Sequence, residues 1–328
     1  MYLSLVPLGD IQSLSEYNCS SVASPGHPYW ETRGDPKISF GIFCIVFGLV
    51  SEGGYFFMLT AIVHLLEVSS YKMLFFLGVL DTAALIFISI YTGVQLILGD
   101  VFCMNPDLNY IIGAVNLGLY SAASCCCLFL VINRLLVMFR KWSAIFKGYR
   151  TWLLLLIPSL YGVYFALFTP ALLFNSKNYS WVTNPFIVKD DAELYINWAQ
   201  VGNNFFVVFV TGVLYVILAI VLHYKTSAVT SPISSKQSSR NSDVYLQMML
   251  ISSMNLASSV LFTIMNFIVV PDWLNILGQL LWMFQNGCPP FVYLALNATM
   301  RNSAKGIVIK RFFGGRKRSS VSPVTPFS

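Results

Sequence analysis

Two carboxylate side chains, Glu52 and Asp81, stand inside long apolar stretches of this sequence. An ionisable group in such surroundings is costly to desolvate, so it usually faces other helices or a water-filled cavity and marks a functional position. Asp81 fits two interpretations: a polar hub or ion site whose hydration changes between two states of the protein, or a carboxyl group bonded to neighbouring helices. Glu52 fits the same two, and the Gly53-Gly54 pair that follows it also favours close packing of helices.

The sequence offers no constellation for catalysis. No nucleophile stands beside a base, no phosphate-binding loop is present, and His27, His64 and His223 lack the spacing of metal ligands. We therefore expect neither an enzyme nor a bound metal or cofactor. Amide side chains on several apolar stretches, among them Asn203-Asn204 and Gln279, are expected to form an interhelical network or to line a pocket.

Two short motifs stand at the ends of apolar stretches and suit a conformational switch. In Ile132-Asn133-Arg134-Leu135-Leu136, an arginine at a membrane boundary can reach a polar network or a docked partner, although it also suits a simple membrane anchor. In Gly287-Cys288-Pro289-Pro290-Phe291-Val292-Tyr293, Pro290 interrupts the helical hydrogen bonds and allows a bend. Tyr293 can then move between two packing positions.

The composition requires that these residues be carried by membrane helices. Hydrophobic residues make up 56% of the chain, charged residues 10%, and the mean hydropathy is +0.69. A bilayer core about 30 Å thick needs about 20 apolar residues per helix, and continuous apolar stretches are unlike the alternating strands of a membrane barrel. The predicted fold is an all-α bundle of seven transmembrane helices, at residues 39-66, 73-98, 107-138, 151-174, 198-223, 244-270 and 273-297.

Charge predicts the orientation, because lysine and arginine are retained in the cytoplasm. With the N-terminus outside, the cytoplasmic segments hold 16 basic and two acidic residues, whereas the outer segments hold four basic and ten acidic residues. The N-terminus is therefore expected outside and the C-terminus in the cytoplasm. The net charge of +6 reflects this topology and does not indicate a nucleic-acid partner.

The outer side is expected to carry a disulfide and a glycan. Of the seven cysteines, this topology leaves Cys19 and Cys103 on the oxidising side, where a disulfide between them is favoured over two free thiols. The sequons at Asn178 and Asn18 both lie outside. Asn178 is the better candidate for glycosylation, since a disulfide at Cys19 competes with modification of its neighbour.

The chain is expected to divide into an extracellular segment (1-38), a receptor domain of seven helices (39-298) and a cytoplasmic tail (299-328). The third inner loop, Ser231 to Ser242, is rich in serine and is predicted to be a flexible linker. In the tail, basic residues interleave with Ile307, Val308, Phe312 and Phe313. This pattern predicts an amphipathic helix on the inner leaflet, in contact with membrane lipid, with a disordered basic tail as the alternative.

Together these motifs resemble the nematode serpentine chemoreceptors, most closely their class T, from about Tyr17 to Arg301. The resemblance rests on Tyr17-Asn18-Cys19-Ser20, Tyr71 to Asp81, Phe102-Cys103, Leu130 to Leu136, Phe174 to Lys177, Asn184-Pro185-Phe186 and Asn286 to Leu294. Asn133-Arg134 is similar to the Asp-Arg-Tyr motif of rhodopsin-type receptors, with an amide in place of the acid. Pro290 and Tyr293 are similar to the Asn-Pro-x-x-Tyr motif. The second outer loop, however, lacks the cysteine usual in those receptors.

The resemblance implies a receptor at the plasma membrane, in the cilia of sensory neurons, that detects an external small molecule and activates a heterotrimeric G protein. We expect the ligand to bind among the outer halves of the helices and to favour an inward-open arrangement that admits the G protein. A transporter, with Glu52 or Asp81 titrating during its cycle, and a ligand-gated channel remain the alternatives.

Overall fold

The computed structural model describes residues 11–22, 34–138, 143–187, 192–227, 232–265, 267–268 and 270–312. This part of the chain is almost entirely helical. The α-helices are α1 (Ile38–Val63), α2 (Ser69–Leu85), α3 (Thr92–Leu98), α4 (Pro106–Met138), α5 (Arg150–Leu154), α6 (Leu156–Phe168), α7 (Trp198–Ser227), α8 (Pro232–Met265), α9 (Asp272–Gly287), α10 (Pro289–Leu296) and α11 (Ala298–Phe312). Two short antiparallel strands, β1 (Leu173–Asn175) and β2 (Ser180–Val182), form a hairpin, residues 173–182, between α6 and α7.

Five helical stretches of the described chain are long and apolar enough to cross a membrane: Ile38–Val63, Ser69–Leu98, Pro106–Leu136, Arg150–Phe168 and Trp198–Val221. Large apolar side chains on their outer faces are exposed, including Leu160 (68%) and Phe209 (72%). Exposed apolar surface of this extent is typical of helices that face lipid. The chain is therefore a multi-pass helical membrane protein.

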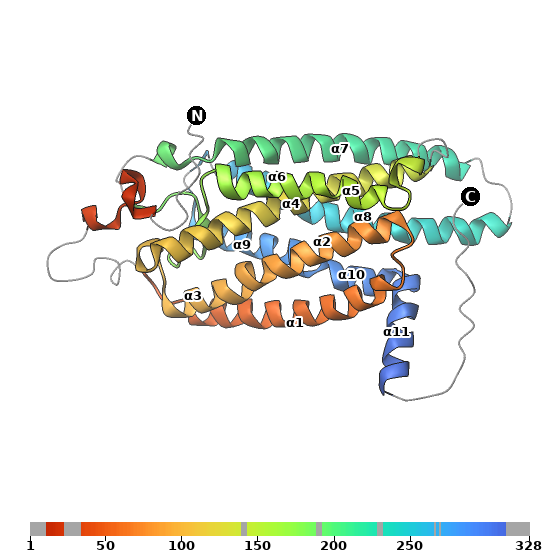
Figure 1. Cartoon of the computed structure of the whole chain (residues 1–328), viewed down its shortest axis with the longest axis horizontal. Coiled ribbons are helices and arrows are strands. Elements are labelled where there is room, and N and C mark those ends of the chain that lie inside the picture. The colour runs from red at the N-terminus through yellow and green to blue at the C-terminus, as the bar shows by residue number, and fades with distance from the viewer. Residues whose placement is uncertain are drawn as a thin grey trace.

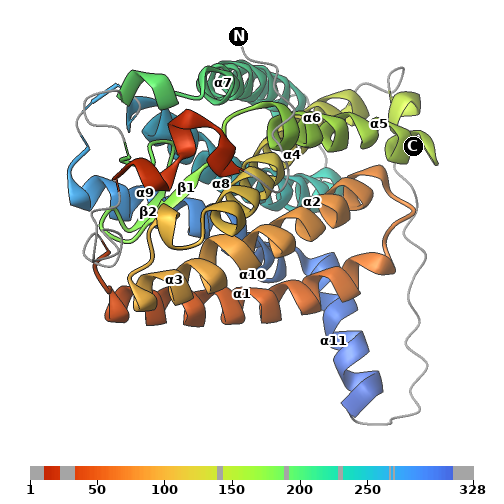
Figure 2. The same ribbon diagram turned by 60° about the vertical axis from the view of Figure 1, so that its left-hand side comes forward.

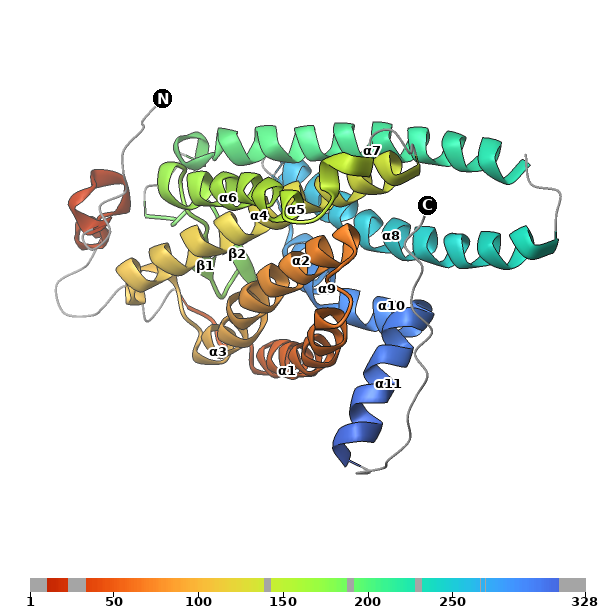
Figure 3. The same cartoon turned by 45° about the vertical axis from the view of Figure 1, so that its right-hand side comes forward.

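The helices lie side by side in one bundle (Figure 1). α4 is central and contacts α2, α6 and α7, while α1 packs against α2 and α3, and α8 packs between α7 and α9. The hairpin, residues 11–22 and the start of α4 lie at one end, called here the hairpin end (Figure 2). α11 lies at the opposite end, the α11 end, where it projects across the bundle axis (Figure 3).

Glycine pairs bring two helix pairs into close contact. A Cβ atom on Gly118 of α4 would lie 2.8 Å from the carbonyl oxygen of Gly162 on α6. Gly41 of α1 and Gly93 of α3 face each other in the same way. A Cβ atom added to either glycine would lie 2.6 Å from the carbonyl oxygen of the other. Close backbone approach at small residues is how helices associate where burial from water supplies no driving force.

The second membrane stretch contains a turn of π-helix, Ile86–Tyr91, between α2 and α3. The hydroxyl of Thr92 donates to the carbonyl oxygen of Phe87 (2.8 Å), five residues earlier. A π-turn widens the helix and leaves carbonyl groups available to other partners. One of these, at Ile88, is used by α9, as described below.

Two predictions made from the sequence are wrong here. The helix of the fourth apolar stretch ends at Phe168, whereas the sequence predicted residue 174. Leu173 already belongs to β1. Residues 232–242, predicted to be a flexible linker, are the first turns of α8.

The tail begins with the helix α11, joined to α1 by a hydrogen bond from the Ser303 hydroxyl to the Ala61 carbonyl oxygen (3.2 Å). Residues 313–328 of the predicted tail lie outside the described chain.

Candidate functional site

Asn133 and Arg134 lie near the α11 end of α4, beside the start of α2. The buried Asn133 amide accepts a hydrogen bond from the Ser70 hydroxyl (2.9 Å) and donates one to the Ser69 hydroxyl (3.1 Å). Asn133 therefore connects α4 to α2. The half-buried Arg134 acts electrostatically on the hydroxyl of Tyr293, which is on α10.

Pro290 and Tyr293 lie where the last apolar stretch is interrupted. α9 ends at Gly287 and α10 starts at Pro289, so two consecutive prolines without N–H groups stand in the first turn of α10. Gly54 of α1 leaves room for this turn, because a Cβ atom there would lie 3.3 Å from Pro290 Cγ. The Tyr293 hydroxyl is buried and makes no hydrogen bond within the described chain. It is thus available to a new partner if α10 moves.

Asp81 is buried at the meeting point of α1, α2 and α9. Its Oδ2 atom accepts a hydrogen bond from the Tyr55 hydroxyl (2.8 Å), which also lies 2.7 Å from the carbonyl oxygen of Asn286. A phenol has a single hydrogen to donate, so Tyr55 divides it between two acceptors on two helices. Glu52, one turn earlier on α1, is half-buried, and its Oε1 atom has no hydrogen-bond partner among the described residues. In the described part of the chain, no hydrogen bond joins Glu52 to Asp81.

A buried polar layer crosses the middle of the bundle. The Tyr120 hydroxyl of α4 is 2.9 Å from Asn204 Oδ1 of α7 and 2.9 Å from the Ser259 hydroxyl of α8. Tyr161 of α6 donates to Asn203 Oδ1 (2.9 Å), and Asn203 in turn donates to Asn204 (3.3 Å). This layer, called the Tyr120 layer below, connects four helices by neutral groups.

The hairpin penetrates the bundle at its end. Trp181 Nε1 donates to the Thr92 hydroxyl (2.8 Å) at the end of the π-turn, and the Ser180 hydroxyl donates to Gln279 Oε1 of α9 (3.3 Å). Gln279 Nε2 donates to the Ile88 carbonyl oxygen (2.7 Å), which the π-turn presents. Ser180 is fully buried and Trp181 is 3% exposed. The hairpin is therefore held inside the bundle by α9 and by the π-turn.

Residues 11–22 cover the hairpin end and are tied to α4 and to the turn before it. Cys19 and Cys103 form a disulfide. The backbone N–H of Ile11 donates to Asp107 Oδ1 (3.2 Å), and the Tyr195 hydroxyl donates to the carbonyl oxygen of Glu16 (2.7 Å). Residues 11–22 thus act as a cap over the first turn of α4.

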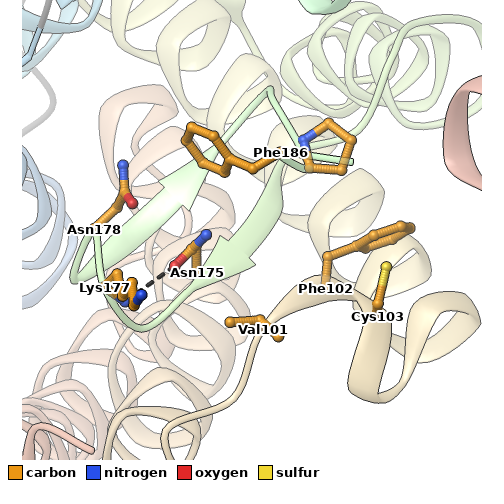
Figure 4. A pocket seen from close by; sticks show the side chains of 8 residues that line it. Val101, Phe102, Cys103, Asn175, Lys177, Asn178 and Phe186 are labelled. Carbon is orange, nitrogen blue, oxygen red and sulfur yellow. Dashed lines mark hydrogen bonds between the residues drawn. The ribbon is translucent and has the colours of Figure 1, made fainter. Parts of the chain in front are cut away.

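A shallow cavity of about 210 Å³ opens beside this disulfide (Figure 4). It is lined by Val101, Phe102, Cys103, Asn175, Lys177, Asn178, Pro185 and Phe186. Asn178 is half-buried at its rim, whereas Ser180 of the same sequon is fully buried in the bundle. Asn18 of the other sequon accepts hydrogen bonds from the backbone and the hydroxyl of Ser20.

Several residues of these sites were not singled out from the sequence. Tyr55, the partner of Asp81, and Ser69 and Ser70, the partners of Asn133, are small polar or aromatic residues of a kind found throughout apolar helices. Trp181 stands in the segment between two apolar stretches, where the sequence predicts a surface loop and gives no sign of a buried hairpin. Tyr120 was expected from the sequence to be a packing or interfacial residue, because the partners of its hydroxyl lie 84 and 139 residues away.

The fold is thus that of a multi-pass helical membrane protein with a capped end, an interhelical polar layer, and an arginine that acts electrostatically on a buried tyrosine. Residues 1–316 match the family described as serpentine type 7TM GPCR chemoreceptor Srt. The chain belongs to this family. It is also similar to Serpentine receptor class T-55 of Caenorhabditis elegans, with 22% identity over 295 residues, which covers 88% of this chain and 79% of that protein.

Proposed function

We propose that this chain is a chemosensory receptor that binds an external small molecule and activates a heterotrimeric G protein. In this proposal α8, and α9 with α10, are the sixth and seventh membrane spans, the hairpin end faces outward and the α11 end faces the cytoplasm. The protein then resides in the plasma membrane, with the sensory cilium as the proposed location. Family membership and the charge asymmetry of the sequence support this arrangement.

The observation that carries the proposal is the buried Tyr293 hydroxyl, which has no hydrogen-bond partner in the described chain and lies within electrostatic reach of Arg134. Arg134 acts on the Tyr293 hydroxyl, and this buried hydroxyl has no hydrogen-bond partner within the described chain. An unpaired buried hydroxyl is unfavourable, so a second arrangement in which Tyr293 gains a partner would be stabilised by the new hydrogen bond. A ligand that binds this second arrangement better shifts the population toward it.

The second inner connection is built to present a surface to a partner. Lys72 of α2 donates to the Gly148 carbonyl oxygen (2.6 Å), and the Thr151 hydroxyl donates to the Phe146 carbonyl oxygen (2.5 Å). These bonds hold residues 146–151, the described part of this connection that leads into α5. A G protein that docks at the α11 end would contact this connection and Arg134 together.

The test is a G-protein activation assay in cells that express the chain, screened against a broad panel of odorants and metabolites. Arg134→Ala is the paired variant, and Lys177→Ala, which changes an exposed basic residue of the hairpin end, is the control. We expect responses that Arg134→Ala abolishes and Lys177→Ala retains, at equal surface expression. A current or a solute flux that needs no G protein would replace the receptor proposal by a channel or a transporter.

A further inference from the structure

Asn116 of α4 has a side-chain amide that is buried without partners among the described residues. Asn116 is 1% exposed, and neither its Oδ1 nor its Nδ2 atom has a hydrogen-bond partner within the described chain. A buried amide that lacks both of its hydrogen bonds is strongly unfavourable in apolar surroundings. The site is therefore expected to receive its missing partners from outside the chain.

The position of Asn116 is fixed by the contacts on its face of α4. Residues three, four and seven apart share one face of a helix. Towards the hairpin end, Gly113 packs against the carbonyl oxygen of Leu172, and Asn109 Oδ1 accepts the backbone N–H of Phe174 (2.8 Å). Towards the middle of the bundle, Tyr120 enters the Tyr120 layer. Asn116 thus lies between the hairpin and that layer.

The Tyr120 layer supplies a second unpaired group. Asn204 accepts hydrogen bonds from Tyr120 and Asn203 through Oδ1, but its Nδ2 atom is buried without a partner in the described chain. Asn204 is fully buried. The polar atoms without a hydrogen bond on Asn116 and Asn204 are therefore one acceptor and two amide donors. Leu117, next to Asn116 in the chain, belongs to a buried apolar cluster with Tyr120 and Trp282.

The charges of the bundle limit the ligand. Lys72 and Asp81 are the charged side chains that are buried in the described chain. Lys72 is at the α11 end. Asp81 accepts a hydrogen bond from Tyr55 (2.8 Å) and lies near Cys126 and Cys127. These cysteines are ten residues or more beyond Asn116 on α4, or about 15 Å along the helix axis. No buried ionic group of the described chain is thus at hand to neutralise a charged ligand beside Asn116.

We propose that Asn116, with Asn204 Nδ2, is the recognition point for a neutral small molecule that carries both a hydrogen-bond acceptor and a donor, such as an amide or an alcohol, on an apolar body. This inference rests on the proposed receptor function and names the class of its ligand. The acceptor of the ligand pairs with an amide N–H, and its donor pairs with Asn116 Oδ1. Gly113, three residues before Asn116, packs against the backbone of Leu172, so the proposed ligand is small.

The test measures thermal stabilisation of the purified full chain in lipid nanodiscs by probes that share one length. Hexanamide carries both functions, 2-heptanone an acceptor alone, heptane neither, and hexylammonium a charge. We expect hexanamide to stabilise the protein at the lowest concentration and heptane and hexylammonium to have the weakest effects. In Asn116→Leu, the apparent affinity for hexanamide should fall about tenfold, which corresponds to roughly 1.4 kcal/mol, while the effect of heptane is unchanged.

Asn105→Leu, which changes an exposed amide at the start of the same helix, is the matched control and should leave the hexanamide effect intact. Asn116→Ala is the second variant, should the leucine not fit. If hexanamide is no better than heptane, or binds Asn116→Leu equally well, the amide is served by water alone and the proposal is wrong. The assay needs no G protein, so binding without G-protein activation would contradict the receptor proposal and leave this site standing.

Discussion

Replacing Gly113 with alanine is expected to force the hairpin out of its seat on α4. The added Cβ atom would lie 1.6 Å from the carbonyl oxygen of Leu172 and 2.7 Å from its carbonyl carbon. An ordinary carbon–oxygen contact is about 3.3 Å or longer. The backbone just before β1 must therefore move by more than 1 Å.

The energetic cost can be worked from the contacts that this movement disturbs. Overpacking of a well-packed site costs about 1–3 kcal/mol, and the hydrogen bond from the Phe174 N–H to Asn109, one turn away, adds about 1 kcal/mol when it is broken. The better helix propensity of alanine returns about 1 kcal/mol. Gly113→Ala should thus destabilise the protein by about 1–3 kcal/mol.

Gly212→Ala provides the matched control on α7, because a Cβ atom there meets nothing within 4 Å. This variant should keep or slightly raise the stability of the wild type. The measurement is thermal unfolding of both purified variants in nanodiscs, together with the rate of proteolysis within the hairpin. If Gly113→Ala is as stable as Gly212→Ala and its hairpin is equally protected, the hairpin does not sit against α4 as described.

Three further outcomes are expected. Cys103→Ser removes a disulfide that spans 84 residues, so it should lower the free energy of unfolding by about 2–5 kcal/mol and expose residues 11–22 to protease. Cys44→Ser, which changes a free cysteine, should leave residues 11–22 protected. Equal protease protection of both variants would contradict a role for the disulfide. Trp181→Phe removes the hydrogen bond to Thr92 and should cost about 1 kcal/mol in thermal unfolding, with the 63%-exposed Trp198 as the control for Trp→Phe. Burial raises the pKa of Asp100, so the folded state prefers the protonated carboxyl, and this preference is lost as the pH rises through the raised pKa. Asp100→Asn should therefore be more stable than the wild type at pH 7 and lose this advantage near pH 4; an advantage that does not vary with pH would refute the assignment.

Much of the helical frame was predictable because it depends on local composition. Apolar stretches of sufficient length gave the five stretches that qualify as membrane spans, with ends that differ by a few residues. The end of α6 was misjudged because Leu172, Leu173 and Phe174 are as apolar as a membrane helix, yet they are buried in a hairpin. The helical start of α8 was missed because a serine-rich sequence favours a linker and has no strong tendency of its own to form a helix.

The arrangement of the sites was less predictable, since it depends on contacts distant in sequence. The π-turn at Ile86–Tyr91 has neither proline nor glycine to announce it, and its carbonyl at Ile88 is used by Gln279, 191 residues away. The partners of Asn133 could not be read from the motif, which carries an amide where related receptors carry an acid. Asn116 lacks partners in the described chain, a property that no sequence pattern expresses.

The central claim is that the chain activates a G protein from the α11 end. It is tested most directly by reconstituting the purified chain with a heterotrimeric G protein in lipid vesicles and measuring nucleotide exchange, with and without the compounds that stabilise the receptor. We predict that at least one such compound accelerates exchange and that Arg134→Ala removes this acceleration while the compound still binds. Binding that leaves exchange unchanged for every G-protein class tested would contradict the account.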